Sequence, residues 1–213
     1  KRILTNIALD FPELGYYQGM NYLVIFIYET FKDELTAYRF LHFIADKFLK
    51  TKLEKSFKGV MEMIFLSDKL MQIAIPKTWQ KMKAGNMSSI HFSVSLMITI
   101  FATLIKDPSL YGIVYRIWDL FLVDGFLVVL KSQLHILKLQ EKEMVSLADE
   151  DVLMSMKDIE KNPFCVAQFV GANQERVKEI ESKISKKEIN SLSVDKNSYT
   201  RLVSHYWAIH SAI

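Results

Sequence analysis

The stretch GYYQGMNYLVIFIY, residues 15–28, places a glutamine between glycines in a turn that leads into an apolar segment. From Met20 to Tyr28 the apolar side chains are nearly continuous, which is typical of a helix buried on most sides. Gly19 or Asn21 could cap the start of this helix. Gln18 therefore stands just before a buried element, and it is the strongest candidate for a functional side chain.

The sequence on both sides of this stretch predicts an all-α fold. Half of the 213 residues are hydrophobic, and only 7 Gly and 4 Pro are present, too few for the turns of a strand-rich domain. Upstream, a helix should end near Asp10, because Pro12 disfavours helical geometry at Phe11. Apolar spacing predicts further helices at 34–49, 53–75 and 89–105, and two more that meet at Asp124 and Gly125.

Residues 84–105 carry no Asp, Glu, Lys or Arg and are long enough to be a candidate membrane span. Polar side chains interrupt the segment throughout, and lipid would offer them no water to bond. A buried helix is therefore favoured over a span. The polar residues are Asn86, Ser88, Ser89, His91, Ser93, Ser95, Thr99 and Thr103.

Charge and cysteine content exclude several classes of function. The net charge of +3 is too small to argue for nucleic acid, and one cysteine, Cys165, allows neither a disulfide framework nor a multi-cysteine metal site. There is no phosphate-binding P-loop, no GxSxG and no HExxH. The scattered histidines have no ligand spacing, so no metal and no cofactor are expected. The expected location is the cytoplasm, including the cytosolic face of membranes or a cytoskeletal assembly.

The amide of Gln18 can donate and accept hydrogen bonds at once, as a side chain that orients an attacking water beside a phosphate must. The flanking glycines would let a partner approach the backbone closely. A turn glutamine that bonds only its own loop is the alternative, and it is favoured on side-chain chemistry alone.

Together, YYQGMN at residues 16–21 and RIWDLFLVDG at 116–125 resemble the TBC family of GTPase-activating proteins that act on Rab GTPases. The resemblance covers residues 1–164 and implies a multi-helix TBC-like domain of two helical subdomains, the N-terminal one incomplete, with a boundary near 76–87. It implies that Gln18 is a catalytic glutamine finger. Tyr16, Tyr17, Gly19 and Asn21 would contact the Rab-type partner, whereas Arg116, Trp118, Asp119 and Gly125 would be structural.

The sequence departs from the family in two places. The family carries an IxxDxxR segment upstream, whose arginine stabilises charge on the transferred phosphoryl group, and no such pattern precedes Gly15. Arg2 lies in the wrong segment for this role. Either the chain is a piece of a longer polypeptide or the protein has lost its arginine finger. In addition, Ser95 stands where the family commonly has tryptophan, in a region that often faces the partner.

Residues 165–213 are expected to form a helical extension that packs on the domain. Within it, residues 173–190 should form a surface helix whose lysines 183, 186 and 187 are more readily explained as a solvated face than as a contact with lipid or an acidic partner. Two functions follow. One is a Rab GTPase-activating domain, weakened by the missing arginine. The other is a non-catalytic TBC-like structural or scaffolding subunit of a larger assembly.

Overall fold

Helices account for all the regular secondary structure in the described part of the protein. The structure is a computed structural model that describes residues 1–106, 111–148 and 151–152. The all-α prediction is confirmed. The elements are α1 (Arg2–Asp10), α2 (Met20–Phe31), α3 (Glu34–Ile44), the π-helical turn η1 (Ala45–Leu49), α4 (Lys58–Ala74), α5 (Pro76–Ala84), α6 (Ile90–Thr99), the 3-10 helix η2 (Ala102–Lys106), α7 (Tyr111–Asp124) and α8 (Phe126–Ser146). The predicted extension at 165–213, with Cys165 and the lysine cluster, lies outside the described residues.

Local capping signals explain several helix boundaries. α1 ends at Asp10, and α2 begins after Gly19. The Asp33 carboxylate accepts a hydrogen bond from the Thr36 N–H at 2.7 Å and so caps α3. Pro76 opens α5, where its missing N–H costs no hydrogen bond. α7 and α8 meet at Asp124 and Gly125, as predicted.

The fourth helix starts later than its apolar spacing suggests. The sequence predicts a helix from Leu53, but α4 begins at Lys58 and residues 53–57 form turns. These turns fold the chain back on itself, so that a Cβ at Gly59 would lie 2.6 Å from Cα of Lys52.

The predicted single helix at 89–105 is wrong, because α6 stops at Thr99 and the short helix η2 follows. Ile100 and Phe101, which connect them, have φ values of 49° and 62°. Such left-handed conformations are rare for bulky side chains and persist only where tertiary contacts stabilise them. Both residues are fully buried, and the Trp118 indole N–H donates to the Ile100 carbonyl at 2.8 Å.

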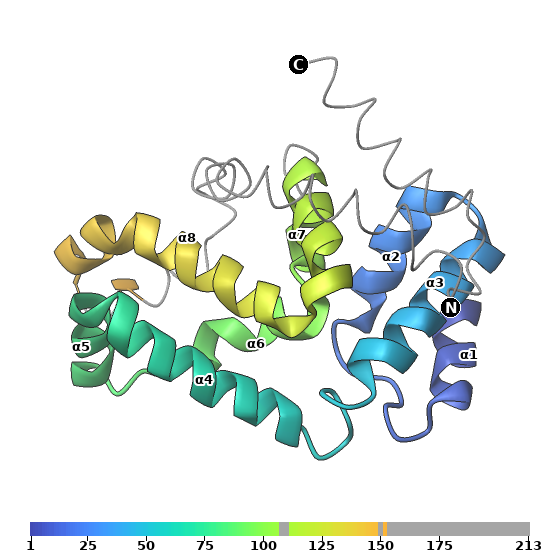
Figure 1. Cartoon of the computed structure of the whole chain (residues 1–213), viewed down its shortest axis with the longest axis horizontal. Coiled ribbons are helices and arrows are strands. Elements are labelled where there is room, and N and C mark those ends of the chain that lie inside the picture. Colours follow the sequence, from blue (N-terminus) through green and yellow to red (C-terminus); the bar gives the residue numbers. More distant parts are fainter. Residues whose placement is uncertain (107–110, 149–150, 153–213) are drawn as a thin grey trace.

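Two groups of helices are joined through α6 and η2. In Figure 1, α1, α2 and α3 lie on the right and α4, α5 and α8 on the left. α6 contacts α4 and α8 as well as α2, and η2 contacts α2 and α7. A large apolar core runs through both groups, and a smaller cluster that includes Met71, Met82 and Met144 lies where α4, α5 and α8 meet. The subdomain boundary near 76–87 stays a prediction.

Among the described residues, none of the helices combines the length and the apolar character needed to cross a membrane. The segment that raised the question, residues 84–105, is divided between the end of α5, the ten-residue α6 and η2.

Replacing Trp118 by phenylalanine should lower the free energy of unfolding by about 2–3 kcal/mol, because it leaves the buried Ile100 carbonyl without its donor and opens a void in the core. Urea unfolding followed by circular dichroism measures this change.

Trp79, a half-buried residue of α5 whose ring lies 4.9 Å from Lys83 Nζ, provides the matched control. Its replacement by phenylalanine should cost less than about 1 kcal/mol, since no buried carbonyl depends on it. Equal losses for the two variants would contradict the importance of the Trp118 hydrogen bond.

Candidate functional site

A tight turn at residues 15–19 presents Gln18 to solvent. Gly15 has a φ of 60°, and its N–H donates to the Phe11 carbonyl at 2.8 Å. The N–H of Met20 donates to the Tyr17 carbonyl at 3.1 Å, which closes the turn as α2 begins. The Gln18 side chain is exposed.

Gly19 occupies a position that a side chain would disturb in two ways. Its φ of 102° is one that only glycine adopts readily. A Cβ added there would lie 3.0 Å from Cγ2 of Thr99 on α6. Glycine therefore lets the turn and the C-terminal end of α6 approach closely.

The adjacent tyrosines of the turn differ in their surroundings. Tyr16 is 59% exposed and lies beside Leu4 and Leu9 of α1, whereas Tyr17 is only 6% exposed. The Tyr17 hydroxyl donates to the Ile98 carbonyl at 3.1 Å. Burial raises the pKa of the Tyr17 phenol far above its usual value, so the phenol keeps its proton at physiological pH.

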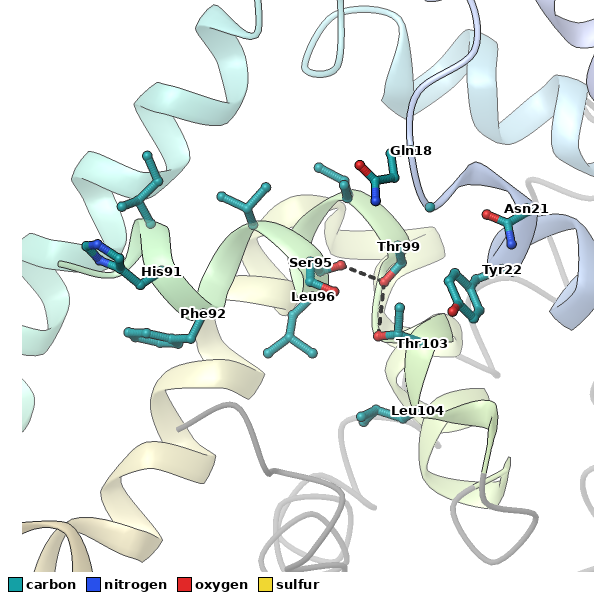
Figure 2. A pocket seen from close by; sticks show the side chains of 14 residues that line it. Gln18, Asn21, Tyr22, His91, Phe92, Ser95, Leu96, Thr99, Thr103 and Leu104 are labelled. Atoms are coloured by element: carbon teal, nitrogen blue, oxygen red, sulfur yellow. Dashed lines mark hydrogen bonds between the residues drawn. The ribbon is translucent and has the colours of Figure 1, made fainter. Parts of the chain in front are cut away.

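The turn forms one side of a pocket with a volume of about 790 Å³. Figure 2 shows Gln18 close to the C-terminal end of α6, with Asn21 and Tyr22 of α2 beside it. The opposite wall consists of α6 and η2, including Ser95, Thr99 and Thr103. Of the predicted site residues, the structure thus brings Gln18, Gly19 and Asn21 to one pocket.

Hydroxyl groups line the α6 wall in a row. The Thr99 hydroxyl donates to the Ser95 carbonyl at 2.7 Å, and its oxygen lies 3.5 Å from Oγ1 of Thr103. The spacing of four residues places Ser95 and Thr99 on one face of α6, and Thr103 continues the row on η2. The same hydroxyl residues are visible in the sequence, but they were interpreted there only as evidence against a membrane span.

Ser93 and Ser95 occupy opposite sides of α6. Ser95 is exposed and lines the pocket, whereas Ser93 is fully buried and accepts a hydrogen bond from the Gln133 amide of α8. The same amide lies 3.3 Å from the Ser67 hydroxyl of α4. Gln133 therefore joins α8 to α4 and α6, and Ser93 is not a pocket residue. His91 is exposed and lines the pocket at the start of α6.

The pocket wall offers hydrogen bonds and apolar surface but little charge. Its described lining residues include no Lys, Arg, Asp or Glu. Within the described ranges, no cluster of three or more His, Cys, Asp and Glu side chains could hold a metal ion. The amide of Gln18 and the hydroxyls can orient a polar group, but they cannot neutralise a charged one.

The second sequence landmark lies away from this pocket. Arg116 is buried, and its guanidinium faces the Asp119 carboxylate at 3.5 Å on the same helix. Trp118 fills the core beneath the end of α6, and Gly125, with a φ of 62°, is the N-cap residue of α8. None of these residues lines the pocket.

Comparison with known proteins gives a consistent set of relatives. The profile of the Rab-GTPase-TBC domain matches residues 1–145. The chain is similar to the GTPase-activating protein GYP5 of Saccharomyces cerevisiae, 25% identical over 148 residues that cover 69% of this chain and 16% of that protein. It is also similar to TBC1 domain family member 2A of Homo sapiens, with 27% identity over 154 residues, 69% of this chain and 16% of that protein. Small G protein signaling modulator 3 of Mus musculus is 23% identical over 145 residues, 68% of this chain and 19% of that protein.

The chain thus spans less than a fifth of the length of these relatives. No solved structure gives a significant match to it.

Replacing Gly19 by alanine should lower the free energy of unfolding by about 1–3 kcal/mol. Alanine disfavours the φ of this position, and its Cβ would also crowd the Thr99 methyl group. Chemical unfolding in urea measures the loss.

Gly85 at the end of α5 is the control, since its φ of −82° suits any residue and the nearest atom to its added Cβ would be the flexible end of Met87. Alanine at Gly85 should change stability by less than about 0.5 kcal/mol. If the Gly19 variant is as stable as the Gly85 variant, the turn does not depend on its close approach to α6.

Proposed function

The chain belongs to the Rab-GTPase-TBC domain family, and from this premise we propose that it binds a Rab-type small GTPase at the Gln18 pocket and contributes to GTP hydrolysis. The observation that carries the proposal is the exposed Gln18 at the rim of the pocket, on a turn built by two glycines. In the bound state its amide would accept a hydrogen bond from the attacking water and donate one to the GTPase, which orients the water for attack.

The neutral wall of the pocket fits a contact with a protein surface. Apolar side chains of α6, such as Val94 and Leu96, alternate with the hydroxyls of Ser95 and Thr99 along the lining. Such a surface can pack against a loop of the GTPase and hydrogen bond its backbone. Asn21 and the exposed ring of Tyr16 extend the proposed contact area on the side of the turn.

Charge on the transferred phosphoryl group would need a cation from elsewhere. An arginine finger typically contributes about 10³-fold or more to GTPase turnover. The pocket-lining residues that the structure describes contain no arginine or lysine, and the described Arg2 pairs instead with Glu34 of α3. We therefore expect residues 1–213 by themselves to bind the GTPase but to stimulate hydrolysis weakly.

A non-catalytic scaffolding role is the second candidate, and the uncharged pocket is the observation that favours it. The same surface could hold a GTPase, or a subunit of a larger assembly, without accelerating any reaction. In this case Gln18 would contribute only a rim contact.

The test is single-turnover GTP hydrolysis across a panel of Rab-type GTPases. It should be run with residues 1–213 and with the longest native polypeptide that contains them. For a GTPase that responds, replacement of Gln18 by alanine should lower the stimulated rate at saturation by roughly 10²-fold, because the water loses its orienting amide. Binding to the GTP-loaded GTPase should change much less, since the rest of the pocket remains.

Gln80, an exposed glutamine of α5 that does not line the pocket, provides the matched control, and its alanine variant should behave as the unmodified protein. Stimulation that survives the loss of Gln18 would refute its catalytic role. Binding without stimulation by either polypeptide would support the scaffold, and failure to bind any GTPase in the panel would refute Rab binding at this pocket.

A further inference from the structure

Of the side chains in the turn at residues 15–19, only that of Tyr17 is buried. Tyr16 and Gln18 are exposed, and the remaining positions are glycines. The resemblance to the TBC family places Tyr17 among the partner contacts. In the free protein, however, its ring points inward and its hydroxyl already has a partner, the Ile98 carbonyl.

The carbonyl that Tyr17 reaches is available because α6 ends abruptly. The last carbonyls of any helix have no partner within the helix. α6 stops at Thr99, and the left-handed conformation of Ile100 turns the chain away. The hydroxyl of Tyr17 donates to the carbonyl of Ile98 at 3.1 Å, over a separation of 81 residues. The end of α6 is thereby tied to the start of α2.

A second contact lies on the other side of Gln18. Gly19 approaches Thr99 so closely that an added Cβ would be 3.0 Å from the threonine methyl group. The backbone is therefore anchored to α6 immediately before and immediately after Gln18. An exposed, flexible side chain gains a defined starting direction when both of its neighbours are held.

We propose that Tyr17 is a positioning residue, which acts through its hydrogen bond to Ile98 to hold the Gln18 turn at a fixed place relative to the α6 wall of the pocket. This inference rests on the proposed function for its catalytic consequence. The anchoring itself is a property of the free protein and can be measured without a GTPase.

The first measurement compares Tyr17→Phe with the unmodified protein by amide hydrogen exchange. The informative amide is that of Met20, which donates to the Tyr17 carbonyl and so reports on closure of the turn. In the Tyr17→Phe protein its exchange should be faster by about tenfold, because the turn separates more often from α6. Unchanged exchange at Met20 overturns the proposal.

Tyr115→Phe is the matched control. Tyr115 is 7% exposed, and its hydroxyl lies 2.9 Å from Oγ1 of Thr30, within the core and away from the pocket lining. This variant also loses one phenolic hydrogen bond, but it should leave the Met20 amide unaffected. Equal acceleration in both variants would show a general loss of stability and would overturn the specific role of Tyr17.

The second measurement uses a GTPase that responds in the hydrolysis panel. Tyr17→Phe should lower kcat by about tenfold and change KM less than about twofold, because the GTPase still binds while the glutamine is misplaced. Tyr115→Phe should change neither constant. An unchanged kcat despite faster exchange at Met20 would overturn positioning of Gln18 by Tyr17.

If Tyr17→Phe does not fold, Thr99→Ser loosens the second anchor while it keeps the hydroxyl, and the same faster exchange and lower kcat are expected from it. If the unmodified protein stimulates no GTPase, the proposed function has failed. That result is distinct from failure of the anchor, which the exchange of Met20 reports independently.

Discussion

The abrupt end of α6 is the constraint on which the site depends. The chain leaves the helix through Ile100 and Phe101, apolar residues held in left-handed conformations that neither would adopt without support. Trp118 donates to the Ile100 carbonyl from the core, and Tyr17 donates to the Ile98 carbonyl from the glutamine turn. The turn at residues 15–19 and Trp118 of α7, which are far apart in sequence, thus meet at residues 98–100, where α6 ends.

This meeting point explains why the two sequence landmarks of the chain belong to one structural unit. Trp118 does not line the pocket, yet it supports the exit of α6, from which the pocket wall continues into η2. Gln18 lies on the pocket side, close to the C-terminal end of α6 (Figure 2). Trp118 in the core and the exposed amide of Gln18 are therefore connected through the backbone of α6. A substitution that disturbs the core beneath the pocket wall should also shift the turn at residues 15–19.

Sequence reasoning predicted the elements whose causes are local. Pro12 indicated the end of α1, and Asp124 with Gly125 correctly separated α7 from α8. The break after Thr99 was missed because the apolar run continues through Ile100 and Phe101, and the support comes from Trp118, 18 residues from Ile100. Likewise, glycine flanks indicated the exposed Gln18, but a turn has no periodicity that could tell a buried Tyr17 from an exposed Tyr16.

The hydrogen bonds of Ser93 bear on how the pocket can move. Apolar contacts between helices tolerate small rotations, whereas a hydrogen bond between buried groups does so only at a cost. Ser93 faces Gln133 of α8 on the buried side of α6, and Ser95, two residues later, faces the pocket. The buried hydrogen bond between Gln133 and Ser93 therefore fixes the rotation of α6 about its own axis. This rotation sets the direction in which the hydroxyl row points toward an incoming protein.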